Sequence, residues 1–316
     1  MRHLILFFTA IVSISVSAAS VFYNSKLVSK IDVDFVPTYF FKVDSTGNLI
    51  SYTRDINSLW LYNVKSKTAV SVAGEYDPVF LPVVDLAKKF VFTAYRSFGV
   101  SMYSYEEPGQ AQLLYQDLTH IGLYESAGIL SKSNVAKFTF RVMMQSASSQ
   151  FTIKDYTYNF KNDPMVETLD AVPEAICPGQ TLSMAILSKD GNEVVAYDLD
   201  DQKTKVFQIV KGEACIVKDD LGGIVGKSSF SYNGNYIAYH SLSSWVYNVD
   251  GYVKIPDGTV VGNIYLFDRK TKKHVALTSF TEGTAMYPEF LSNGDIIFVR
   301  YINGAAEFYR IKPDAQ

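Results

Sequence analysis

Short runs of alternating apolar and polar residues, separated by polar turns that often contain glycine, extend along most of the chain. A clear example is FSYNGNYIAYHS, residues 230–241, in which an aromatic residue precedes the turn and apolar residues alternate with polar ones after it. Alternation with a period of two is typical of a strand that buries one face. This run therefore predicts a β-hairpin whose turn contains Asn233 and Gly234.

The same pattern recurs along the chain, which indicates a repeat architecture. The last positions of six copies are Thr53, Thr93, Arg141, Ala185, His240 and Arg300, at spacings of 40, 48, 44, 55 and 60 residues. The fourth copy is placed at residues 176–185, with a turn one residue shorter. Blades of a β-propeller tolerate loop insertions around a typical period of about 40–50 residues, whereas a solenoid keeps its period more strictly.

Two apolar columns support this register. The first contains Ile50, Phe90, Phe138, Leu182, Ile237 and Ile297, and the second contains Tyr52, Phe92, Phe140, Met184, Tyr239 and Val299. Because the two columns lie two residues apart, both are expected on the same face of each strand.

A second hairpin follows each copy, so each unit is expected to contain four antiparallel strands. The pattern thus predicts an all-β, six-bladed β-propeller. Its blades are expected at about 37–76, 77–124, 125–171, 172–216, 226–281 and 286–313. The last unit has only three predicted strands, while residues 21–36 belong to no blade. We therefore expect the N-terminal strand to complete the sixth blade, which would remove an exposed sheet edge.

Residues 1–19 have the pattern of a secretory signal peptide. Arg2 and His3 form a short basic region, residues 4–16 are apolar, and small residues follow. An uncleaved anchor is the alternative, but the apolar run is short for a membrane span, and no later stretch approaches 18 apolar residues. The mature chain, residues 20–316, is therefore expected in a bacterial periplasm or outside the cell, without a transmembrane segment.

Composition and cysteine content narrow the classes further. A formal net charge of −3 and a pI of about 5.8 argue against a nucleic-acid-binding protein, which usually carries a basic stripe. An oxidising compartment permits a disulfide between Cys177 and Cys215. Two free thiols are the alternative, because the sequence does not set the distance between them.

The repeat resembles that of TolB-type, WD-repeat-like bacterial propellers, which follows P-x-F-S-x-D-G-x-x-I-A-F, then an I-Y-x-x-D strand and a closing L-T. The matching positions are Tyr287, Pro288, Phe290, Asn293, Gly294, Ile296, Ile297, Phe298, Asp268, Leu277 and Thr278. TolB also has an N-terminal α/β domain of more than a hundred residues, whereas about 18 residues lie here between the signal peptide and the first blade. The resemblance therefore implies the propeller alone and does not transfer the role of TolB in the envelope complex.

Cationic residues recur near the end of the repeat and suggest a ligand site. Arg141, His240 and Arg300 occupy one repeat position, and Arg54 and Arg96 lie just past it in two further blades. If they faced a common mouth, they would form a cationic funnel for a carboxylate, a phosphate or an acidic peptide, since arginine binds such groups with paired hydrogen bonds. The alternative is structural, in that a polar residue at this position can pair with a carboxylate of a neighbouring blade.

The largest insertion, residues 242–262, is a second candidate, because loops often carry function. Trp245, Tyr247 and Tyr252 would suit a partner interface if exposed, although the segment can also pack on its own blade. The sequence contains no H-E-x-x-H motif, so no metal site is expected, and no G-x-S-x-G motif, so the nucleophile elbow of a hydrolase is missing. No cofactor is expected.

These observations favour a monomeric, non-enzymatic binding or scaffold module for a periplasmic or envelope protein or peptide. The alternative is a glycan-active hydrolase or lyase with a carboxylate pair in a central channel. The sequence does not reveal such a pair, because its two members would come from different blades.

Overall fold

The computed structural model consists of β-strands joined by turns and loops. It describes residues 22–33, 41–55, 58–71, 76–79, 90–95, 99–104, 111–115, 124–134, 137–145, 150–159, 165–168, 174–242 and 260–314. Every regular element within these ranges is a strand. No helix among the described residues has the length and apolar character needed to cross a membrane.

The first sheets along the chain are antiparallel and contain consecutive strands. One contains β2 (Phe41–Val43), β3 (Leu49–Asp55), β4 (Ser58–Asn63) and β5 (Thr68–Ser71). The next contains β6 (Tyr76–Val79), β7 (Phe90–Tyr95), β8 (Gly99–Ser104) and β9 (Ala111–Tyr115). A third contains β10 (Tyr124–Asn134), β11 (Lys137–Gln145), β12 (Phe151–Asn159) and β13 (Met165–Thr168), and the short β14 (Glu174–Ala175) also pairs with β12.

The remaining strands continue this order. A fourth sheet contains β15 (Leu182–Leu187), β16 (Glu193–Asp198), β17 (Lys203–Gln208) and β18 (Ile216–Gly222). Next come β19 (Ser228–Phe230), β20 (Tyr236–Leu242), β21 (Gly262–Asp268) and β22 (Lys273–Ala276). The last group contains β23 (Thr284–Phe290), β24 (Ile296–Ile302), β25 (Ala305–Asp314) and the N-terminal β1 (Phe22–Ile31), which pairs antiparallel with β25. A single parallel bridge between Gly262 and Thr284 joins these two groups into one eight-stranded sheet, and apart from this bridge each group is four-stranded and antiparallel.

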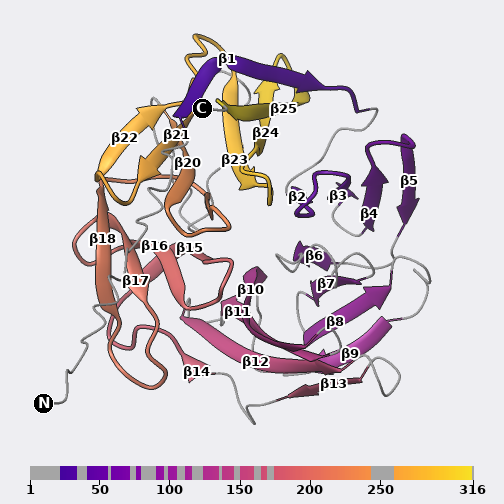
Figure 1. The fold of residues 1–316 in the computed structure, drawn as a ribbon, viewed down its shortest axis with the longest axis vertical. Coiled ribbons are helices and arrows are strands. Elements are labelled where there is room, and N and C mark those ends of the chain that lie inside the picture. Colours follow the sequence, from indigo (N-terminus) through magenta and orange to yellow (C-terminus); the bar gives the residue numbers. More distant parts are fainter. Residues whose placement is uncertain are drawn as a thin grey trace, which may run out of the picture.

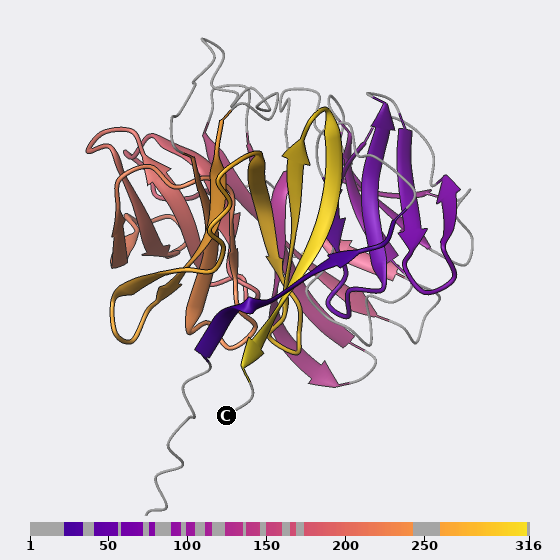
Figure 2. The ribbon, with the colours of Figure 1, turned by 90° about the horizontal axis from the view of Figure 1, so that it is seen from above.

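The first strands of successive sheets lie next to one another around a common centre (Figure 1). β2 contacts β6, β6 contacts β10, β10 contacts β15, β15 contacts β19, β19 contacts β23, and β23 contacts β2. Figure 2 shows the sheets from the side and β1 crossing beside the C-terminal strands. The first strands therefore surround the centre, and the last strand of each sheet lies toward the periphery.

The hydrophobic core lies between neighbouring sheets. Buried side chains of β15–β17 pack on one side against Met143, Phe151 and Ile153 of the third sheet. On the other side, Val195 and Val206 pack against the sheet that begins with β19. Burial on both faces removes apolar surface from water along the whole sheet, which is the main favourable term in folding.

The fourth repeat copy was expected at residues 176–185, and this placement is wrong. Leu182 and Met184 belong to β15, which is the first strand of its sheet, and the hairpin connects β15 to β16 through the turn at residues 188–192. The fourth strand, β18, also runs past residue 216, where the repeat placed the end of this blade. The true copy, AILSKDGNEVVAY (residues 185–197), follows the same pattern as residues 228–240.

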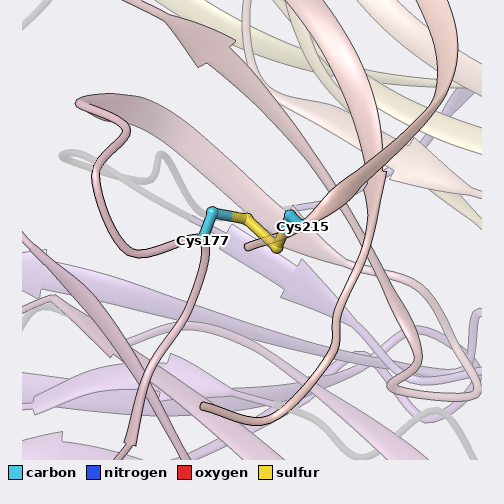
Figure 3. Close-up of a disulfide and its surroundings, with 2 residues drawn as sticks. All are labelled: Cys177 and Cys215. Atoms are coloured by element: carbon cyan, nitrogen blue, oxygen red, sulfur yellow. A yellow bond between two sulfur atoms is a disulfide. The ribbon is translucent and has the colours of Figure 1, made fainter. Parts of the chain in front are cut away.

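A disulfide fastens the fourth sheet to the third. Cys177 and Cys215 are joined, with their Cα atoms 4.7 Å apart (Figure 3). Cys177 is buried and lies two residues after the end of β14, which pairs with β12, whereas Cys215 directly precedes β18. The bond therefore links the edge of one sheet to the outer hairpin of the next.

We predict that replacing both cysteines by serine lowers the free energy of unfolding by about 3–4 kcal/mol, because the bridge closes a loop across a sequence separation of 38 residues. Urea unfolding of the oxidised wild type and of the variant measures this difference. The variant and the reduced wild type should unfold at similar urea concentrations, and equal stability of all three would contradict the prediction.

Candidate functional site

Arg141 is buried between the third and fourth sheets. Its guanidinium donates from Nε and Nη2 to both carboxylate oxygens of Asp155, at 2.7 and 2.9 Å, and from Nη1 to the carbonyl oxygen of Gly191 at 2.9 Å. Lys211 lies 3.0 Å from the same carboxylate. Burial would raise the pKa of Asp155, but the hydrogen bonds and charges of Arg141 and Lys211 outweigh it and lower that pKa. Arg141 thus connects its own sheet to the next one.

His240 lies on β20 and is only 1% exposed. Its ring packs edge-on against Tyr287, with the ring centroids 5.6 Å apart, and the Tyr287 amide donates to Nδ1 at 3.5 Å. The other side of the ring lies against Gly226, where an added Cβ would be 2.0 Å from Nε2. Burial lowers the pKa of His240 to about 3, although a backbone hydrogen bond at Lys227 acts in the opposite direction. The imidazole is therefore neutral at ordinary pH.

Arg300 lies on β24 and faces the preceding sheet, whereas His240 on β20 faces the following sheet. Its guanidinium lies 4.2 Å from the centroid of the Phe280 ring and donates from Nη2 to the carbonyl oxygen of Glu282 at 2.9 Å. Phe280 and Glu282 both precede β23 and follow β22, so these contacts are with the preceding sheet. His240, by contrast, contacts Tyr287 on the following one.

Arg300 and His240 face different sides because the turn before β24 closes one residue earlier than the turn before β20. In the turn before β20, Ser231 N donates to Tyr236 O, whereas in the turn before β24, Leu291 N donates to Asp295 O. A slip of one residue turns every side chain of a strand to its other face.

Core packing shows the same slip. Ile237 and Tyr239 pack against the preceding sheet, whereas Ile297 and Val299 pack against the first sheet, which follows them around the centre. The apolar columns are therefore wrong at Ile297 and Val299, and Arg300 does not share the orientation of His240.

The structure describes only part of the remaining residues that were predicted to bind a ligand or a partner. The backbone of Arg54 lies in β3, but the structure does not describe its side chain. Arg96, Trp245, Tyr247 and Tyr252 lie outside the described residues. Since Arg141, His240 and Arg300 have different surroundings and His240 is neutral, the described members do not form one cationic group. A site that includes Arg54 and Arg96 stays a prediction.

A different set of charged side chains meets at the centre. We call Lys42, Lys189, Ser229 and Glu289 the central cluster. Lys42 Nζ lies 2.6 Å and Lys189 Nζ 3.7 Å from the Glu289 carboxylate, and Ser229 Oγ donates to it at 3.3 Å. Lys42, Ser229 and Glu289 come from the first strands β2, β19 and β23, and Lys189 comes from the turn between β15 and β16. Four sheets therefore contribute to one ion cluster.

Equivalent turn residues gather beside this cluster. In four first-to-second strand turns, a glycine amide donates to the carbonyl oxygen three residues earlier. The position directly after that carbonyl is occupied by Ser45, Lys189, Tyr232 and Ser292, which we call the turn quartet. Ser45 hydrogen-bonds to the Tyr232 side chain, Ser292 N donates to Ser45 O at 2.8 Å, and Lys189 Nζ lies 5.4 Å from the centroid of the Tyr232 ring. The quartet thus forms one end of the central region.

The charges of the central cluster do not cancel. Burial would raise the pKa of Glu289, but Lys42 and Lys189 outweigh it and hold that pKa below its usual range. Burial lowers the pKa of Lys189, and the like charge of Lys42 lowers it further, whereas Glu289 acts in the opposite direction. Asp44, at the base of a quartet turn, accepts hydrogen bonds from Thr46 and from backbone amides of its own turn. The cluster therefore holds two ammonium groups and one carboxylate.

The cationic residues predicted from the sequence lie at the end of the second strand of each repeat, whereas this site lies at the end of the first strand and in the turn that follows it. Lys42, Ser229 and Glu289 share one repeat position, directly before the last residue of the first strand. The turn quartet shares another. Both are variable positions of the repeat, and polar side chains there were the available signal.

Comparison with protein-family models and with curated proteins finds no match for this chain. Among solved structures, it is similar to the β-propeller domain of Myceliophteria thermophila Cps50 (Swd1), with a TM-score of 0.54 and 10% identity over 89% of this chain and 98% of that chain. The fold is a β-propeller.

Two oligogalacturonate lyases are also similar to this propeller. One, from Vibrio parahaemolyticus, has a TM-score of 0.49 and 13% identity over 90% of this chain and 93% of that chain. The other was solved in complex with manganese and has a TM-score of 0.48 and 11% identity over 91% of this chain and 93% of that chain.

We predict that His240 contributes to acid destabilisation of the propeller. Its pKa is lower in the folded state, at about 3, than the usual 6.5, so the unfolded chain takes up a proton that the folded chain excludes as the pH falls below 6.5. The free energy of unfolding should drop by about 2 kcal/mol between pH 7 and pH 5 from this group alone. Urea unfolding of wild type and His240→Asn at both pH values measures it, and an equal drop in the two proteins would count against this role.

Proposed function

We propose that this chain is an exported binding protein, a six-bladed propeller that binds a protein, peptide or envelope ligand at the end of its central channel marked by the turn quartet. The observation that carries the proposal is the central cluster, in which side chains from four sheets place a net positive charge beside these turns. Charge in a concave site attracts an oppositely charged ligand more strongly than the same charge on an open surface.

Six blades closed by the N-terminal strand are supported by the contacts of the first strands, which run from β2 through β23 and return to β2. β1 adds a fourth antiparallel strand to β23–β25. Val28 packs on the core between the last two groups of strands, and Lys30 forms an ion pair with Glu307 on β25 at 2.7 Å. The blade boundaries follow those expected from the repeat, except that we extend the fourth blade to residue 222.

Export is supported by the signal-like residues 1–19, which lie outside the described residues, and by the disulfide. The TolB-type resemblance agrees with a periplasmic location. We propose that the protein acts there as a monomer.

The state of Glu289 favours binding over the glycan-active hydrolase of the alternative interpretation, whereas a lyase, which needs a base, stays the alternative. Acid catalysis of glycoside cleavage needs a carboxyl group with a raised pKa that donates a proton. Both lysines of the cluster and Ser229 instead stabilise the ionised form of Glu289 and lower its pKa. Glu289 therefore lacks the property required of the acid in such a pair, and the net positive charge of the cluster suits a binding site.

We predict that a photo-crosslinking amino acid at Ser292 captures the partner from periplasmic extract. Ser292 is exposed and belongs to the turn quartet. The same crosslinker at Lys218, which is exposed on the outer strand β18, serves as the matched control. Mass spectrometry should identify a product specific to Ser292, and absence of any product, or equal products at both positions, would overturn the proposed binding site.

Ring closure predicts that deletion of residues 22–31 lowers the melting temperature by at least about 10 °C, because it exposes the β25 edge and the apolar surface under Val28. Differential scanning calorimetry compares the deletion with the Lys30→Met variant, which removes only the ion pair with Glu307 and should shift the melting temperature slightly. An unchanged melting temperature after deletion would contradict closure by β1.

A further inference from the structure

The central cluster contains one positive charge more than its carboxylate can balance. We infer that the turn-quartet end of the channel binds a single carboxylate group of a peptide, with Lys189 as its main donor and Lys42 behind it. This inference rests on the proposed function and names the chemical group that the binding site recognises.

The hydrogen bonds of Glu289 leave Lys189 as the more available ammonium. Oε1 is held by Lys42 at 2.6 Å, and Oε2 accepts from Ser229 at 3.3 Å, whose own Oγ accepts from the Phe290 amide at 3.1 Å. Lys189 lies further away, at 3.7 Å from Oε2. An ammonium group has three donors, so Lys189 keeps capacity for another acceptor. The side chain of Lys189 is 19% exposed and that of Lys42 is 24% exposed, which leaves both within reach of a ligand.

Electrostatics favours a monoanion. Within the central cluster, two ammonium groups and one carboxylate leave one positive charge without a counterion among the cluster's own side chains, and this charge is costly because the site is largely removed from water. One incoming carboxylate restores neutrality. A doubly charged phosphate would make the site negative beside Glu289, which is less favourable.

The environment of Lys189 agrees with this assignment. Burial and Lys42 lower the pKa of Lys189, so an additional anion beside it should raise that pKa again. Carboxylate binding is therefore expected to become weaker as the pH rises and Lys189 loses its proton. The Tyr232 ring lies beneath the ammonium and provides an apolar surface next to the charged group.

Sterics favour a peptide over a uronic acid glycan. The quartet turns of the first and last sheets are tied together by the bond from Ser292 N to Ser45 O, and Tyr232 is tied to Ser45 as well. Only 19% of the Lys189 side chain is exposed, so a ligand group must reach in past these turns. An acidic side chain or a chain end reaches such a site on a flexible stalk, whereas the carboxylate of a uronic acid is attached directly to a sugar ring that must enter with it.

The test uses the mature full chain and NMR titration of the Lys189 and Tyr232 amide signals at pH 7, up to 10 mM of each probe. The probes are a blocked pentapeptide with a central Glu, the same peptide with Gln, an N-acetylated peptide with a free C-terminus, a uronic acid disaccharide and inorganic phosphate. One charge-assisted hydrogen bond corresponds to roughly tenfold in affinity. We expect the Glu peptide or the free C-terminus to bind about tenfold tighter than the Gln peptide, and the stronger of the two identifies the source of the carboxylate.

Substitutions of Lys189 distinguish a loss of its charge from a general disturbance of the fold. Lys189→Met should remove this preference, and Lys189→Arg should keep it within about threefold. Lys218→Met, which removes a lysine on the outer strand β18, should leave it unchanged. Glu289→Gln should strengthen carboxylate binding, because it leaves both lysines without a counterion, even though it lowers stability.

Several outcomes would overturn the inference. Equal binding of the Glu and Gln peptides, or no binding of either carboxylate peptide, rules out carboxylate recognition. Tighter binding of the disaccharide or of phosphate rules out a peptide carboxylate. If crosslinking from Ser292 still succeeds in these cases, the proposed binding function stands and only the ligand class is wrong. If crosslinking fails as well, both are wrong.

Discussion

Packing of each sheet against its two neighbours is the constraint on which the rest of this structure depends. A strand sends alternate side chains to opposite faces, so every sheet here must present apolar groups in both directions. The β24 strand shows this directly, since Ile296 and Phe298 pack on the preceding sheet while Ile297 and Val299 pack on the following one. Both faces are buried, so the strand reads as a continuous apolar run, and its hydrophobicity does not indicate which side chain faces which neighbour.

This ambiguity explains why the expected funnel differs from the observed site. His240 and Arg300 occupy the same place in a sequence repeat, yet a turn that closes one residue earlier sends Arg300 to the opposite face. Arg141 has the orientation of His240, but both of its outer nitrogens are engaged with Asp155 and Gly191. Positions equivalent in sequence are thus equivalent in space only where the turn length is conserved between copies.

The central cluster arises from the same ring of contacts. Because the first strands meet around one centre, long side chains reach across it, and a buried Glu289 can hold Lys42 from the first sheet and Lys189 from the fourth. The cluster therefore connects sheets mechanically and also concentrates charge at one end of the centre. Both roles are possible because the cluster residues occupy repeat positions at which core packing does not require an apolar side chain.

Local patterns were enough to predict strands, turns, the propeller fold and the existence of a separate N-terminal strand, since these depend on alternation and on glycine-containing turns within about twelve residues. The fourth repeat copy was misplaced because the apolar residues of β15 follow a Gly-containing turn and so imitate the second strand of the repeat, and only strand pairing distinguishes the two registers. The Lys42–Glu289–Lys189 cluster was decided by tertiary structure alone. Its members lie at least 100 residues apart, and although each is a polar residue at a variable position of the repeat, nothing local in the sequence indicates that they meet.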